Sequence, residues 1–271
     1  MNSMADASQA HTEANPWLPI RNHAEGSRIR LFCLPHAGSG AAIFHTWKRS
    51  LPAIVEVCPI LLPGREARLS DPLYTDSYAL IQKIVEAVEP HLDKPYALFG
   101  HSMGALLAFE VARQLHDKGL RPPTYLFVSG RIAANLSLAH GRTHDLPTPD
   151  FLAELDRRYG GLPQQLLQDQ ELLDIYLPIL RADMQVLETH SYGDRLPLDC
   201  PIMAFAGSND QSVPDESLHA WSTLTRSNFS VHRITGDHFY LTTTGKARLL
   251  EILSEVLTTI DAEAPSATLS T

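Results

Sequence analysis

The chain has 271 residues, of which 44% are hydrophobic and 20% charged, and its formal net charge is −9. This composition is typical of a folded globular protein, and the negative charge argues against a nucleic-acid partner, which needs a basic face. No apolar run of about 18 residues occurs, so we expect no membrane span, and the first residues lack the apolar core of a secretory signal. The 3 cysteines show no metal-ligand spacing and argue against a disulfide framework. We therefore expect a cytoplasmic protein without a bound metal.

Short apolar runs and helical patterns alternate through the first half of the chain. The runs at residues 29–34, 55–62, 96–99 and 124–129 are too short for helices and predict buried strands. Helical patterns follow three of them, around residues 42–48, from about 76 to 88, and from about 103 to 118. Strands that alternate with helices predict an α/β fold with a mostly parallel, doubly wound sheet.

The alternation stops between residues 131 and 199, where no strand is predicted. Two helices are expected there, over residues 149–158 and 170–188, the second kinked or interrupted at Pro178. A helical insertion of this size within an α/β sheet predicts a lid over the active site.

Strands return at residues 201–206 and 229–234, and a final helix is expected over 245–260. The chain is therefore predicted to form a single domain over residues 17–260, with the lid at about 131–199. The polar ends, residues 1–16 and 261–271, predict flexible tails.

Residues 100–104 read Gly-His-Ser-Met-Gly and lie between a predicted strand and a predicted helix. This G-x-S-x-G pattern in that context predicts a nucleophile elbow. The flanking glycines let the chain reverse sharply, and the apex side chain is held at a helix N-terminus, where partial positive charge favours a developing anion. We therefore predict Ser102 as a nucleophile, with the side chain of His101 directed into neighbouring structure.

A serine nucleophile needs a base, and the base needs an orienting carboxylate. His238 is the predicted base because it lies in the loop after the last strand, where the α/β-hydrolase arrangement places it. Asp210, in the loop after the preceding strand, is the predicted acid. The alternatives are Asp237, next to the histidine, Asp215 at the start of a helix, and Asp183 on a lid helix.

A tetrahedral intermediate also needs two backbone donors for its oxyanion. The N–H of Met103, directly after the predicted nucleophile, is one candidate. The other candidate is Ala37, in the glycine-containing turn after the first strand.

Several longer motifs make the chain resemble the type II thioesterases that accompany modular polyketide synthases and nonribosomal peptide synthetases. The resemblance extends from about residue 29 to the final helix. The Pro-Gly-Arg-Glu and Leu-Arg-Ala-Asp motifs are more specific than G-x-S-x-G, because hydrolases in general do not share them. The matching stretches are residues 34–38, 62–66, 99–105, 128–131, 177–183 and 236–240. One departure is Ser39, where the family commonly has a second glycine.

The resemblance implies an α/β-hydrolase that cleaves acyl or aminoacyl thioesters from the phosphopantetheine arm of acyl or peptidyl carrier proteins. It implies no cofactor, since the substrate itself brings the arm, and we expect a monomer. Arg65, Arg157 and Arg158 are the predicted cations for the substrate channel and carrier docking; the alternative is that they are solvated surface charges. Two alternatives remain at this point: a carboxylesterase or lipase that uses the same triad on oxyesters, and a non-catalytic binding module.

Overall fold

The computed structural model describes residues 15–19, 26–137, 141–162, 164–193 and 195–263. Most of each predicted tail lies outside these residues. At the N-terminal end, the side chain of Asn15 donates a hydrogen bond to the carbonyl of Ala87 (3.0 Å). At the other end, the final helix runs to Glu263 and so passes the predicted limit of residue 260.

Six parallel strands form one sheet in the order β2-β1-β3-β4-β5-β6. The chain therefore starts inside the sheet and winds outward in both directions, as the doubly wound prediction requires. The strands are β1 (Ile29–Leu34), β2 (Val55–Pro59), β3 (Tyr96–His101), β4 (Tyr125–Ser129), β5 (Ile202–Gly207) and β6 (Phe229–Ile234).

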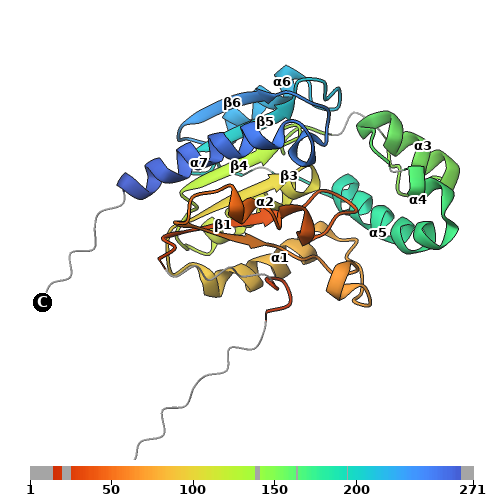
Figure 1. Cartoon of the computed structure of the whole chain (residues 1–271), viewed down its shortest axis with the longest axis horizontal. Helices are drawn as coiled ribbons and strands as arrows, with labels where there is room; N and C mark the ends of the chain where they lie inside the picture. Colours follow the sequence, from red (N-terminus) through yellow and green to blue (C-terminus); the bar gives the residue numbers. More distant parts are fainter. Residues whose placement is uncertain (1–14, 20–25, 138–140, 163, 194, 264–271) are drawn as a thin grey trace, which may run out of the picture.

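Helices cover both faces of the sheet and gather at one end of it (Figure 1). They are α1 (Ser77–Val88), α2 (Met103–Asp117), α3 (Thr148–Tyr159), α4 (Gln164–Gln168), α5 (Gln170–Thr189), α6 (Asp215–His219) and α7 (Lys246–Glu263). Among the described residues, no helix is both long and apolar enough to cross a bilayer.

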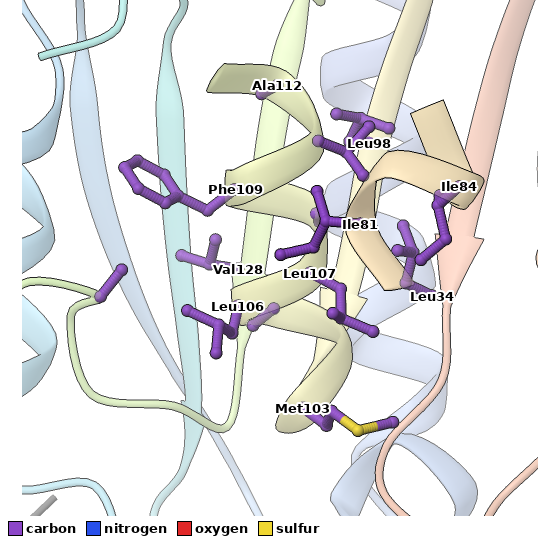
Figure 2. Packing of buried hydrophobic residues seen from close by; sticks show 14 of the residues in the cluster. Leu34, Ile81, Ile84, Leu98, Met103, Leu106, Leu107, Phe109, Ala112 and Val128 are labelled. Atoms are coloured by element: carbon purple, nitrogen blue, oxygen red, sulfur yellow. The ribbon is translucent and has the colours of Figure 1, made fainter. Parts of the chain in front are cut away.

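Alternate side chains of each strand point to two separate apolar cores. On β3, Leu98 packs with α1 and α2 in one core, while Ala97 and Phe99 pack with α7 in the other. Figure 2 shows the first core, where Leu107 of α2 lies beside Ile81 of α1. Burial of each such side chain stabilises the fold by roughly 1.5–3 kcal/mol. The packing holds α2, and hence the residue before it, firmly against the sheet.

The predicted helical insertion is present, because the named elements between β4 and β5 are all helices. Helices α3, α4 and α5 fill this segment and lie together at one end of the sheet, on the right in Figure 1. Helix α5 is continuous through Pro178, so the predicted interruption does not occur. The short helix α4 is not predicted, and the helix expected over residues 42–48 is two short 3-10 turns.

Candidate active site

The elbow places Ser102 at the carboxyl end of β3, directly before α2. Its φ is +53°, an unusual value for a residue with a side chain, and its N–H donates to the carbonyl of Ser129 (2.7 Å). The reversal is tight: a Cβ added at Gly100 would lie 2.0 Å from the carbonyl oxygen of Gly104. A Cβ at Gly104 would lie 2.1 Å from the carbonyl oxygen of Leu34. Only glycine fits at these two positions.

His238 and Asp210 meet although 28 residues separate them in the sequence. The imidazole Nδ1 lies 2.8 Å from the carboxylate Oδ2, and both side chains are buried. Ser212 donates to the other carboxylate oxygen through its backbone N–H (3.0 Å) and its hydroxyl (2.6 Å). Burial alone would raise the pKa of Asp210, but the hydrogen bonds from His238 and Ser212 hold that pKa below its ordinary value. The carboxylate is thus kept ionised beside the imidazole.

The alternative acids have other partners. Asp215 forms an ion pair with Arg233 at 2.5 Å. Asp237 accepts a hydrogen bond from the N–H of Phe239 (2.8 Å). Asp210 is therefore the carboxylate that the structure brings to His238.

His101 points away from the apex and into the protein, as predicted. Its Nδ1 lies 2.8 Å from the hydroxyl of Ser129, which also bonds to the hydroxyl of Tyr240. Burial lowers the pKa of His101 well below its usual value, and the neighbouring His238 and His36 lower it further. A neutral imidazole here ties the elbow to β4 and to the loop that carries His238.

The turn after β1 presents a free backbone donor. The N–H of Ser39 donates to the carbonyl of His36 (3.1 Å), and the N–H of Gly38 donates to the carboxylate of Asp183 (2.7 Å). The N–H of Ala37 makes no hydrogen bond to another described residue. Met103 is the first residue of α2, so its N–H has no acceptor within the helix. Both predicted oxyanion donors are available in the structure.

A buried ion pair that the sequence analysis did not predict supports this turn. The guanidinium of Arg65 contacts both carboxylate oxygens of Asp183, at 2.7 and 2.9 Å, and also donates to the carbonyl of Ser39 (3.2 Å). The two side chains are only 6% and 3% exposed. Arg65 therefore offers no charge at the surface, and the prediction that it docks a carrier is wrong.

Two cavities border Ser102. The first has a volume of about 640 Å³ and is mostly apolar. Ala37 and His238 line it on the sheet side, and Leu166, Leu180 and Met184 line it on the lid side. Because lid helices supply much of this wall, the lid defines the space beside Ser102.

The second cavity has a volume of about 530 Å³ and lies on the side of β4 and α3. Tyr159 and Ser102 line both cavities, so both spaces border the nucleophile. The ring of Tyr159 also packs on the imidazole of His238, with the ring centroids 4.9 Å apart.

The other two predicted docking arginines belong to the second cavity. The side chain of Arg157 is 60% exposed, while that of Arg158 is only 6% exposed. Both bind Glu154, at 2.7 and 2.6 Å. Arg157 is thus accessible to a partner, whereas the side chain of Arg158 is buried in the cavity wall. The described residues contain no cluster of His, Cys, Asp or Glu side chains that could hold a metal ion.

The thioesterase domain family model matches residues 29–258. The chain belongs to the thioesterase domain family. It is 42% identical to the gramicidin S biosynthesis protein GrsT of Aneurinibacillus migulanus, over 85% of this chain and 90% of that protein. The family assignment makes the chain a thioester hydrolase, in agreement with the elbow and the histidine–aspartate pair.

Proteins of known structure that superpose on this chain are also thioesterases. The RedJ thioesterase from the prodiginine biosynthetic pathway of Streptomyces coelicolor superposes with a TM-score of 0.80 and is 35% identical, over 90% of this chain and 99% of that chain. YbtT, a type II thioesterase from the yersiniabactin NRPS/PKS biosynthetic pathway, superposes with a TM-score of 0.74 at 31% identity, over 84% of this chain and 92% of that chain. The fold is that of the α/β-hydrolases, and the predicted resemblance to type II thioesterases is confirmed.

Proposed function

We propose that this thioesterase hydrolyses acyl or aminoacyl thioesters on the phosphopantetheine arm of carrier proteins, through a Ser102–His238–Asp210 triad. The observation that carries the proposal is that the predicted nucleophile and the predicted base line the same cavity. Ser102 stands on a strained elbow, and His238, held by the ionised Asp210, lines the same space. The elbow serine, the acid and the base also follow one another along the chain in the order expected of α/β-hydrolases.

In this mechanism, Ser102 attacks the thioester carbon while His238 accepts the hydroxyl proton. The backbone N–H groups of Ala37 and Met103 stabilise the oxyanion of the tetrahedral intermediate. When the intermediate collapses, the thiol leaves with the proton from His238. A water molecule activated by the same imidazole then attacks the acyl-enzyme and releases the acid. Asp210 fixes the orientation of the imidazole and stabilises its cationic form.

The carrier-bound substrate is proposed from the relatives, whose names place them in biosynthesis of gramicidin S and in NRPS/PKS pathways. The site is consistent with such a substrate, because a thioester has two arms and two cavities border Ser102. We also propose that the protein acts in the cytoplasm, without a cofactor, as an editing enzyme that clears unwanted acyl groups from carriers.

The proposal is tested by comparing hydrolysis of butyryl-carrier protein, butyryl-pantetheine and p-nitrophenyl butyrate. We expect the highest kcat/KM on the carrier substrate and the loss of all three activities, by several orders of magnitude, in Ser102→Ala. A clear preference for the oxyester would favour the carboxylesterase alternative. Near-normal hydrolysis by a folded Ser102→Ala protein would contradict the triad.

A further inference from the structure

Arg131 is a buried cation for which the described residues provide no counter-ion. It lies two residues after β4 and is only 9% exposed, and no hydrogen bond or ion pair joins its guanidinium to another described residue. Its Nε has no partner at all among those residues. Burial lowers the pKa of Arg131 from its ordinary value, as expected for a charge that is removed from water. An arginine nevertheless remains protonated in proteins.

Arg131 lines the second cavity, together with Arg157 and Arg158. Arg158 also has a buried Nη1 without a partner among the described residues, although its Nε is bound to Glu154 (2.6 Å). The described residues that line this cavity include three arginines and no aspartate or glutamate. Glu154 compensates part of this charge, and Asp210 is already bound to His238.

A cationic cavity is unexpected in a chain with a formal net charge of −9. A cleft with one sign of charge and low-dielectric walls concentrates the field on its contents. An uncompensated buried charge costs several kcal/mol, and a hydrogen-bonded anion would recover that cost. Arginine is also the side chain best suited to a carboxylate or phosphate, because its fork can bind two oxygens at once.

We infer that the second cavity is an anion-binding subsite, in which Arg131 and Arg158 bind an anionic group of the thioester substrate. The inference rests on the proposed role of Ser102, which borders both cavities. The ligand chemistry is a carboxylate or a phosphate ester. It has two possible sources: a carboxylate at the end of the acyl chain, or the phosphate of the pantetheine arm.

Two substrate ratios separate these sources. In the first series, malonyl, succinyl and glutaryl thioesters of N-acetylcysteamine are compared with their neutral counterparts, the propionyl, butyryl and valeryl thioesters. In the second, butyryl-phosphopantetheine is compared with butyryl-pantetheine. Each kcat/KM ratio of anionic to neutral substrate is measured for the native protein, Arg131→Met and Arg158→Met. Arg248→Met, which loses the same charge on α7, is the control.

Because a charge-assisted hydrogen bond contributes roughly 1.5–3 kcal/mol, removal of Arg131 should lower one of the two ratios about 10- to 100-fold. A lower kcat/KM ratio in the first series assigns the subsite to a carboxylate of the acyl chain. A lower ratio in the second series assigns it to the phosphate of the pantetheine arm. Arg158→Met should lower the same ratio by a smaller factor, and the control should leave both unchanged.

The inference is overturned if both ratios in Arg131→Met stay within about twofold of the native values. If Arg131→Met does not fold, the same two kcat/KM ratios are compared between Arg158→Met and the native protein, and this comparison decides. A native protein that prefers the neutral member in every pair would also overturn the inference. Butyryl-pantetheine hydrolysis and its loss in Ser102→Ala report separately on the proposed function, so the two failures can be told apart.

Discussion

Arg65 and Asp183, 118 residues apart in the sequence, form a buried two-point ion pair that joins lid helix α5 to the loop after β2. The same carboxylate accepts the backbone N–H of Gly38, so the pair also supports the turn that presents the N–H of Ala37. The Pro-Gly-Arg-Glu and Leu-Arg-Ala-Asp motifs are therefore two halves of one contact. The same two side chains therefore hold the lid helix and the turn whose Ala37 N–H is the predicted oxyanion donor.

Asp183→Asn should strongly destabilise the protein. The substitution keeps the shape of the side chain but leaves the guanidinium of Arg65 buried without a counter-ion, which costs about 3–5 kcal/mol. Urea unfolding monitored by circular dichroism measures this loss. We also expect a lower kcat, because the turn at Gly38 loses its charged acceptor.

The control for this prediction is Glu86→Gln, which removes an exposed ion pair with Lys83 on α1. Exposed pairs contribute at most about 1 kcal/mol, so this variant should unfold at nearly the native urea concentration. If Asp183→Asn were as stable as Glu86→Gln, the buried pair would not hold the lid helix.

Most of the sheet could be predicted from the sequence, because parallel strands buried on both faces appear as short apolar runs. The elbow, His238 and Asp210 could be placed because each follows such a strand. The Arg65–Asp183 pair could not, because its two motifs lie 118 residues apart and nothing in either shows that the loop and the lid helix meet. For the same reason, the sequence suggests Arg65 as a docking cation, whereas the structure buries it. The apolar run also predicts a longer β2 than the structure forms. The strand ends at Pro59, the N–H of Ile60 still donates to the carbonyl of Cys33 on β1 (2.8 Å), and the N–H of Leu61 donates to Trp17 and no longer to a strand (2.9 Å).

Gly104→Ala should prevent folding of the elbow. A methyl group at this position would lie 2.1 Å from the backbone carbonyl oxygen of Leu34, and neither the helix nor β1 can move away without breaking the core. We expect little soluble protein and no hydrolysis. Gly141→Ala is the control, because a Cβ there lies within 4 Å of no atom of the described residues and the substitution should leave the melting temperature nearly unchanged. A soluble, active Gly104→Ala enzyme would show that the elbow is looser than described.

His36 should make the protein less stable in mild acid. Burial is the main cause that lowers its pKa from 6.5 to about 4, against the effect of a hydrogen bond to Ala37. The unfolded chain then binds a proton that the folded chain rejects, so stability is fully present above about pH 6.5 and falls as the pH drops toward 4. Relative to His36→Gln, the native protein should lose about 1–3 kcal/mol more over this range.

The measurement is urea unfolding at pH 7 and at pH 4.5 for the native protein and for His36→Gln. Substitution of the exposed His45 by glutamine should leave the pH dependence as in the native protein. Identical pH profiles for the native protein and His36→Gln would show that His36 is not the group responsible.

Arg157 is the remaining candidate for electrostatic docking of a carrier. It is exposed at the second cavity, whereas the side chains of Arg65 and Arg158 are buried. If an acidic carrier protein binds at this rim, Arg157→Glu should raise the KM for acyl-carrier substrates several-fold, because rim charges act mainly on encounter and on its salt dependence. The kcat/KM for butyryl-N-acetylcysteamine should change little, since this substrate has no carrier.

Arg248→Glu is the matched control for the docking prediction. Arg248 is 56% exposed and pairs with Glu251 three residues further along its helix, as Arg157 is 60% exposed and pairs with Glu154 three residues before it. Both substitutions change the net charge equally, so a difference between them reports position and not total charge. Equal KM values for the carrier substrate in the two variants would remove Arg157 from the docking surface. An equal loss on carrier and small substrates in Arg157→Glu would instead indicate a disturbed cavity, because a docking contact cannot affect a substrate that lacks the carrier.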